Sequence, residues 1–149
     1  MKIYKTNNYG VRLVRDKTTV IVKKIKVSSS DDTERYLRGI WTDIDIYESF
    51  YIIALNNANN TLDYMCISKG GICGTIADLR MIAKFALDKL ATAVIIAHNH
   101  PSGTLKPSMS DLRLTDNIKK GLKTLDILLL DHLILTENEH YSFANNGKL

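Results

Sequence analysis

The chain has 149 residues, of which 45% are hydrophobic and 24% are charged, a composition that indicates one globular domain and excludes a disordered or fibrous chain. No apolar run approaches the roughly 18–20 residues of a membrane span, and the N-terminus lacks the apolar stretch of a signal peptide, so we expect no membrane contact. The two cysteines, Cys66 and Cys73, form neither a C-x-x-C pair nor a disulfide framework, so we expect plain thiols in a reducing compartment, the cytoplasm.

The net charge of +4 is unevenly distributed along the chain. Residues 1–26 carry eight Lys or Arg and one Asp, whereas acidic side chains outnumber basic ones in the remainder. This segment has two interpretations. In the first, it is a surface that binds nucleic acid or another acidic partner. In the second, it is a strand whose lysines face solvent, and the lack of interleaved aromatic residues favours this second interpretation.

Hydrophobic periodicity predicts alternating strands and helices. In chain order we expect a strand over 18–27, a helix from Ser30 or Asp31 to near Trp41, a hairpin of strands 48–55 and 61–67, a helix over 76–90, a strand over 92–97, a helix over 108–123, one or two strands within 126–136 and a last strand over 140–144. The strand–helix–strand unit between residues 61 and 97 favours a mixed sheet with helices packed on it, an α/β (mixed α+β) fold.

The segment "TAVIIAHNHPSGTLKPSMSDLRL", residues 92–114, contains two of the four histidines, His98 and His100. They follow a short apolar strand, and residues i and i+2 of an extended chain point the same way, so both imidazoles can converge on one point. Asp111 lies in the first turn of the next predicted helix. Two nitrogens and one carboxylate oxygen fit a three-ligand zinc site whose open fourth position is typical of catalysis.

Structural roles also fit parts of this pattern. The histidines fit hydrogen-bonded loop residues, and Ser108-x-x-Asp111 fits a capping box, although Asp111 can bind a metal while Ser108 caps the helix. The tripeptide His98-Asn99-His100 does not indicate an HNH nuclease, whose three residues are scattered over a ββα unit. The H-x-E…P-C-x-x-C signature of zinc deaminases and the H-E-x-x-H motif are absent.

The pattern H-x-H-P-x6-S-x2-D, from His98 to Asp111, resembles the JAMM motif of JAB/MPN metalloproteases without a gap. The string "AHNHPSG" and the later "LDHLIL" (130–135) are similar to the RadC-like branch, which is commonly labelled a DNA repair family. The resemblance starts near residue 28, which gives a basic N-terminal segment over 1–27 and a RadC-like JAB/MPN domain over 28–149. It implies a mixed sheet with helices on both sides, similar to the cytidine deaminase fold.

The resemblance also implies roles for five residues. His98, His100 and Asp111 would hold one Zn²⁺ per chain. Glu48 matches an upstream glutamate of the family and would take a proton from the metal-bound water and pass it to the leaving amine. Ser108 would donate a hydrogen bond to the oxyanion of the tetrahedral intermediate. Without the resemblance, Glu48 is an ordinary charged residue at the start of a strand.

Two histidines lie outside this motif. His132 follows Asp131 in a predicted strand near the site. It is either a partner of a metal ligand or a half-buried, hydrogen-bonded histidine, and the second situation is the more common. His140 is expected at the surface.

The main functional hypothesis is a zinc-dependent hydrolase of the metallopeptidase or isopeptidase type, acting on an unidentified protein or peptide. The alternative is a DNA-repair or mobile-element accessory protein that binds nucleic acid through the basic N-terminal segment, with a structural or vestigial metal. Longer RadC-like proteins carry a helix-hairpin-helix region where this chain has only that short segment, which weakens the alternative. A metal-dependent nuclease is disfavoured because two-metal phosphoryl transfer needs more carboxylates. The edge of the 18–27 strand leaves homo-oligomer formation open.

Overall fold

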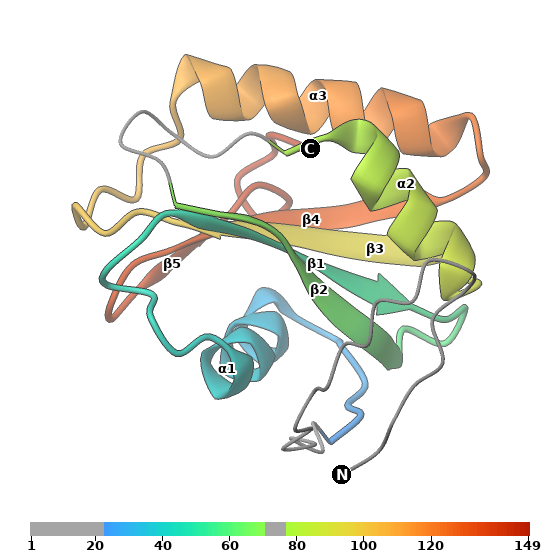
Figure 1. The fold of residues 1–149 in the computed structure, drawn as a ribbon, viewed down its shortest axis with the longest axis horizontal. Helices are drawn as coiled ribbons and strands as arrows, with labels where there is room; N and C mark the ends of the chain where they lie inside the picture. Colours follow the sequence, from blue (N-terminus) through green and yellow to red (C-terminus); the bar gives the residue numbers. More distant parts are fainter. Residues whose placement is uncertain (1–22, 71–76) are drawn as a thin grey trace, which may run out of the picture.

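The computed structural model of the chain describes residues 23–70 and 77–149, which form a five-stranded mixed sheet with three helices packed against it (Figure 1). The strands are β1 (Ser49–Leu55), β2 (Thr61–Lys69), β3 (Ala93–Asn99), β4 (Leu128–Leu135) and β5 (His140–Ser142). The helices are α1 (Ser30–Ile40), α2 (Leu79–Asp88) and α3 (Met109–Lys123). This architecture confirms the predicted fold class.

The strand order β2-β1-β3-β4-β5 makes β3 the central strand. β1 pairs antiparallel with β2 and β3, whereas β3 and β4 are parallel. A parallel pair needs a crossover connection, which α3 provides, so the chain leaves the end of β3 and enters α3 after one loop. β3 is buried along its whole length because it has a strand on each side and helices over both faces.

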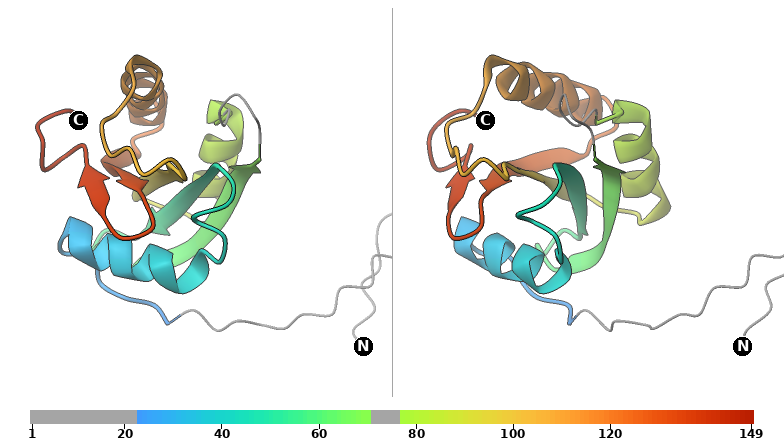
Figure 2. Two further views of the ribbon diagram at one scale, coloured as in Figure 1. Left: turned by 90° about the vertical axis from the view of Figure 1, so that its left-hand side faces the viewer. Right: turned by 60° about the vertical axis from the view of Figure 1, so that its left-hand side comes forward.

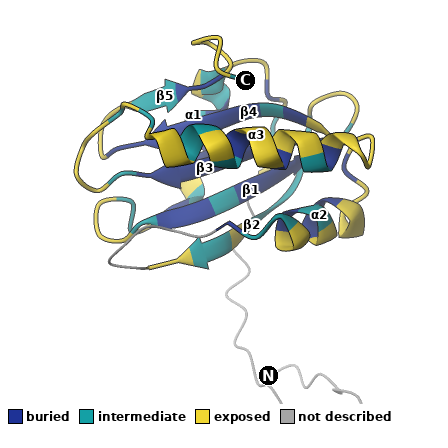
Figure 3. Cartoon of the chain, turned by 90° about the horizontal axis from the view of Figure 1, so that it is seen from above, coloured by how far each residue is buried: buried dark blue, intermediate teal, exposed yellow. Residues whose placement is uncertain are grey.

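α1 covers one face of the sheet, and α2 and α3 cover the other (Figures 1 and 2). On the α2/α3 face, Ile96 packs in one core cluster with Leu122 of α3. On the opposite face, Ile95 packs in a second cluster with Leu37 of α1. Since strand side chains alternate between faces, His98 belongs with Ile96 on the α2/α3 face. β1, β3 and β4 are largely buried, while the outer sides of α2 and α3 are exposed (Figure 3).

Several element boundaries differ from the sequence-based expectation. α1 is capped by Ser29 rather than by Ser30 or Asp31. The Ser29 hydroxyl accepts a hydrogen bond from the Asp32 amide at 3.2 Å, and the Asp32 carboxylate accepts one from the Ser29 amide at 3.1 Å. These two reciprocal hydrogen bonds form a capping box, and the extended segment before α1 ends there. α2 begins at Leu79, after its N-cap, and so later than residue 76.

Other expected strands also differ from the structure. Half of the 18–27 strand, residues 18–22, falls outside the described residues, and within 23–27 only Lys26 pairs, as an isolated bridge with Asn60. Residues 126–136 contain one strand, in agreement with the expected one or two, whereas the last strand ends at Ser142 rather than at 144. None of the helices in the described ranges is long and apolar enough to cross a membrane.

His140 is only partly exposed, in contrast to the predicted surface position. Its Nδ1 lies 3.0 Å from Oε2 of Glu34, and its Nε2 lies 3.2 Å from Oγ of Ser30. Arg38 of the same helix donates a hydrogen bond to the main-chain carbonyl of Thr136 at 3.1 Å. These contacts fasten α1 to the β4–β5 connection.

Candidate metal centre

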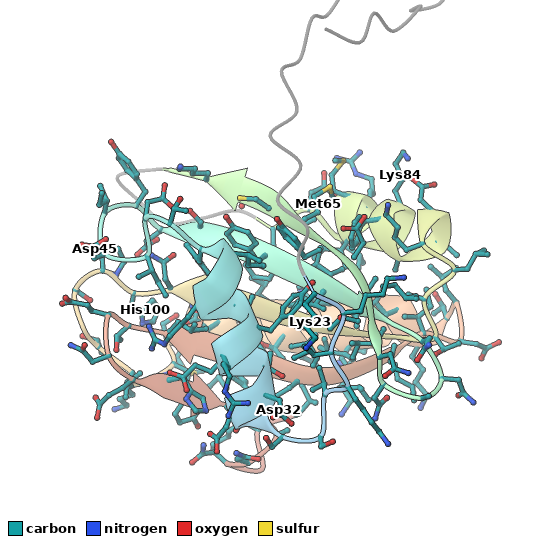
Figure 4. The ribbon with its side chains drawn as sticks, turned by 90° about the horizontal axis from the view of Figure 1, so that it is seen from below. Lys23, Asp32, Asp45, Met65, Lys84 and His100 are labelled. Atoms are coloured by element: carbon teal, nitrogen blue, oxygen red, sulfur yellow. The ribbon has the colours of Figure 1, made fainter. Side chains whose placement is uncertain are left out.

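The three predicted metal ligands meet where β3 ends and α3 begins. His98 Nε2 lies 3.0 Å from His100 Nε2 and 3.3 Å from Asp111 Oδ1. His100 Nε2 lies 3.8 Å from Asp111 Oδ2. Figure 4 shows His100 at the end of the sheet where the loop with Asp45 leads into β1.

These separations fit a metal ion. Ligand atoms about 2.0–2.1 Å from a tetrahedral zinc lie about 3.3 Å from one another. One potential ligand atom from each of His98, His100 and Asp111 lies within 4.8 Å of the other two. The side chains therefore need only small adjustments to surround an ion of this size.

A chain of hydrogen bonds determines which nitrogen of His98 faces the site. Thr115 Oγ1 donates to the main-chain carbonyl of Asp111 at 2.6 Å, so it accepts from Nδ1 of His132, also at 2.6 Å. Nε2 of the neutral His132 ring then carries no hydrogen and accepts from Nδ1 of His98 at 2.8 Å. His98 is left with the lone pair of Nε2 directed at the site.

His132 itself is fully buried, and its ring stacks on Phe143 with ring centres 4.5 Å apart. Burial lowers the pKa of His132 well below its ordinary value, so the ring is neutral and can accept a hydrogen bond. His132 is thus the hydrogen-bond partner of a candidate metal ligand, and it is also the hydrogen-bonded histidine of the second expectation, although it is fully rather than half buried.

His100 is oriented in a similar way. Its Nδ1 lies 2.6 Å from the carbonyl oxygen of Thr104, which can only accept, so Nδ1 carries the hydrogen and Nε2 keeps its lone pair. Both histidines therefore direct unprotonated Nε2 atoms at the same point. This is the form of imidazole that binds a metal.

Asp111 adds a negative charge to the two lone pairs. Burial on its own raises the pKa of Asp111, but hydrogen bonding and charge from His98 when its ring is protonated, with hydrogen bonds from Ser108, outweigh burial and hold that pKa well below its usual range. The carboxylate is therefore ionised. Three acceptor groups this close are stable together only around a positive charge, either a proton or a metal ion.

Ser108 caps α3 and at the same time positions Asp111. The Ser108 hydroxyl accepts from the Asp111 amide at 3.1 Å, and Asp111 Oδ2 accepts from the amide and the hydroxyl of Ser108, both at 2.7 Å. Asp111 Oδ1 is the oxygen nearer to His98. The capping box and the candidate ligand set thus coexist because they use different atoms of Asp111.

Glu48 lies at the same end of the sheet, one strand away. Phe50 of β1 is paired opposite His98, and continuing this antiparallel register by two residues sets Glu48 opposite His100 on the same face. The Glu48 carbonyl accepts from the amide of Gly70 at 2.8 Å, which fixes its backbone beside β2. Of the five predicted site residues, His98, His100 and Asp111 lie together, Ser108 contacts Asp111, and Glu48 is next to them through strand register.

Asn99, between the two histidines, organises the loop that carries Glu48. Its Oδ1 accepts from the amide of Ser49 at 2.7 Å, and its Nδ2 donates to the carbonyls of Ile44 at 2.5 Å and Tyr47 at 2.7 Å. This role was not predicted from the sequence. The sequence feature that could have indicated it is the position of Asn99 at the end of an apolar strand. An amide side chain buried there needs several hydrogen-bond partners.

Comparisons with known proteins agree with this geometry. A family model described as "RadC-like JAB domain" matches residues 27–148. A UPF0758 protein of Flavobacterium johnsoniae is 41% identical over 133 residues, which cover 89% of this chain and 58% of that protein. UPF0758 proteins of Fusobacterium nucleatum and Porphyromonas gingivalis are each 35% identical, over 90% and 85% of this chain and 57% and 56% of theirs.

The chain therefore spans less than two thirds of the length of these curated relatives. The family model covers nearly all of the chain, and it confirms the resemblance that was based on the His98–Asp111 motif. This chain belongs to the family of RadC-like JAB domains.

Proposed function

We propose that this chain is a zinc-dependent hydrolase that cleaves an amide bond in a protein or peptide. The proposal is supported above all by one observation: Nε2 of His98, Nε2 of His100 and the Asp111 carboxylate converge, and hydrogen bonds to both Nδ1 atoms leave the Nε2 lone pairs free. Structural zinc sites are usually closed by four protein ligands, whereas three ligands and an open position are typical of catalytic sites.

The roles of the chain's residues follow from their positions. Zinc held by His98, His100 and Asp111 would supply a Lewis acid that polarises a carbonyl group and lowers the pKa of water to about 7. Glu48 would take a proton from the attacking water and deliver it to the nitrogen of the leaving amine. Asn99 would hold the loop of Glu48 in place, and His132 would fix the ring orientation of His98.

Ser108 would donate a hydrogen bond to the oxygen of the substrate carbonyl as negative charge develops there. In the structure its hydroxyl donates to Asp111 Oδ2, so this role requires the hydroxyl to turn from Asp111 towards the substrate. Such a donor acts only as the transition state forms, and loss of one typically lowers kcat by about 10²–10³.

The test is cleavage of a pooled peptide library by the zinc-loaded chain, with products identified by mass spectrometry. The Glu48→Gln variant is the matched control because it keeps the size and shape of the side chain and removes the base. We expect cleavage by the parent chain and cleavage slower by about 10²–10⁴ in the variant. Equal cleavage by both proteins, or none by the zinc-loaded parent, would contradict the proposal.

Nucleic-acid binding is a second candidate function. It is favoured by the exposed side chains of Lys23, Lys24 and Lys26, which are the basic residues of the N-terminal segment that the structure describes. If these lysines contact phosphates, log K falls with log salt by about 0.7–0.9 for each contact, and changing all three to Glu lowers that slope. An unchanged slope in the triple variant excludes this segment as the binding surface.

A further inference from the structure

A cavity of about 710 Å³ opens beside the candidate metal centre. It lies between the loop that enters α3, the first turns of α3, β5 and the C-terminal segment, which are neighbours in Figure 2. Its volume falls within the roughly 300–1,000 Å³ of known ligand pockets.

Two residues connect this cavity to the metal centre. Thr104 lines the cavity, and its carbonyl accepts from Nδ1 of His100. Ser108 also lines it, and its hydroxyl donates to Asp111. A molecule in the cavity would therefore lie next to the proposed ligands and the proposed oxyanion donor.

The lining of the cavity combines an apolar wall with two cations. The apolar side chains are Leu105, Pro107, Met109, Leu112 and Tyr141. Lys106 and Lys148 also line the cavity, and both are exposed. No ion pair within the described part of the chain engages either lysine.

An occupant that complements this lining carries an apolar group with a negative charge beside it. The apolar group buries the wall, and the negative charge faces the lysines. Nucleic acid is a poorer match because it carries a charge at every phosphate and its bases stack on aromatic side chains, of which the lining has only Tyr141.

We propose that this cavity, here called the side pocket, binds an aliphatic or aromatic residue of the substrate, with an adjacent Asp or Glu facing Lys106 and Lys148. The proposal rests on the proposed amide hydrolase function and names its substrate class. The substrates are peptides or protein segments in which the cleaved amide lies next to an apolar residue that has an acidic neighbour.

Binding is measured with two blocked hexapeptides, one with leucine next to glutamate and one with leucine next to lysine. The zinc-supplied Glu48→Gln chain serves as the receptor, so that turnover does not interfere, and amide NMR signals report the binding position. We expect the acidic peptide to shift signals of Leu105, Met109 and Tyr141, and to bind about tenfold more tightly than its lysine counterpart.

A charge-reversed variant, Lys106→Glu with Lys148→Glu, should invert this preference. Lys119→Glu is the control because Lys119 is an exposed residue of α3 that does not line the side pocket. Equal binding of the two peptides, no shift at millimolar peptide, or an unchanged preference in the double variant would overturn the proposal. So would a single-stranded DNA oligonucleotide that shifts the same signals at lower concentration than the acidic peptide.

The two proposals fail in different ways. If the acidic peptide binds the side pocket but the zinc-loaded parent cleaves nothing in the library, the hydrolase function is wrong and the binding site stands. If the parent cleaves peptides without preference for an apolar residue beside an acidic one, the hydrolase function stands and the side pocket is wrong.

Discussion

His132 Nε2 accepts a hydrogen bond from His98 Nδ1 at 2.8 Å in the interior of the protein. The contact joins β4 to β3, because the parallel register pairs Ile96 with His132 and His98 lies two residues further along. The orientation of a proposed metal ligand is therefore fixed from the core of the sheet, not from the exposed loop that follows it. Partners of this kind set the tautomer and the ring plane of metal-binding histidines.

We predict that His132→Ala weakens zinc binding by about 10–100-fold, since loss of such a partner typically has this effect. His132→Gln should recover part of the affinity because its amide oxygen can accept from His98. The measurement is a competition titration against a chromophoric chelator. Asn56→Ala, which removes an asparagine that bonds only main-chain amides of the β1–β2 turn, is the control. Undiminished zinc affinity in a folded His132→Ala protein would show that the hydrogen bond does not position His98.

The burial of His132 also predicts how stability depends on pH. Because the pKa of His132 is lower in the folded than in the unfolded chain, the unfolded chain binds more protons below about pH 6.5. The free energy of unfolding is therefore undiminished above this pH and falls on acidification by up to about 1.4 kcal/mol per pH unit. Urea unfolding of the metal-free chain at several pH values tests this. His132→Gln should show a shallower fall, and identical profiles would refute the assignment.

Asn99→Ala should separate metal binding from catalysis. Asn99 contacts the loop of Glu48 and no metal-ligand side chain, so the variant should keep its zinc and lose activity. We expect it to be less stable by about 2–4 kcal/mol because buried backbone groups lose their partners. Zinc content, peptide cleavage and urea unfolding are measured together. Asn56→Ala removes an asparagine that bonds main-chain amides in the exposed β1–β2 turn and should leave activity unchanged.

Ser108→Ala and Ser29→Ala form a matched pair, because both serines are N-caps in capping boxes. Each substitution should lower the free energy of unfolding by about 1 kcal/mol. If Ser108 also donates to the substrate, only Ser108→Ala lowers kcat, by about 10²–10³. Equal kcat values in the two variants would restrict Ser108 to the structural role.

Local patterns were sufficient to predict much of this molecule. The apolar run before His98 indicated the buried central strand, and Ser108-x-x-Asp111 indicated the start of α3. The two-residue repeat of a strand also indicated that His98 and His100 face the same point. Each of these inferences depends on residues close together in the chain, where backbone geometry alone sets the relative positions.

Long-range contacts could not be predicted in this way. The contact between His98 and His132 spans 34 residues and depends on the register of two parallel strands, with an irregularity at Val94/Ile95. The contact of Asn99 with Ile44 depends on a loop without periodicity. The start of α1 was misplaced by one residue because the run of serines at 28–30 offers several equivalent caps.

The central claim, a metal centre made by His98, His100 and Asp111 with Glu48 outside it, is tested most directly by zinc content per chain. The parent, Glu48→Ala and His100→Ala proteins are purified without tag or chelator and supplied with zinc. We predict about one zinc in the parent and in Glu48→Ala, and almost none in His100→Ala. A parent chain that binds no zinc, or a Glu48→Ala chain that loses it, would contradict this assignment.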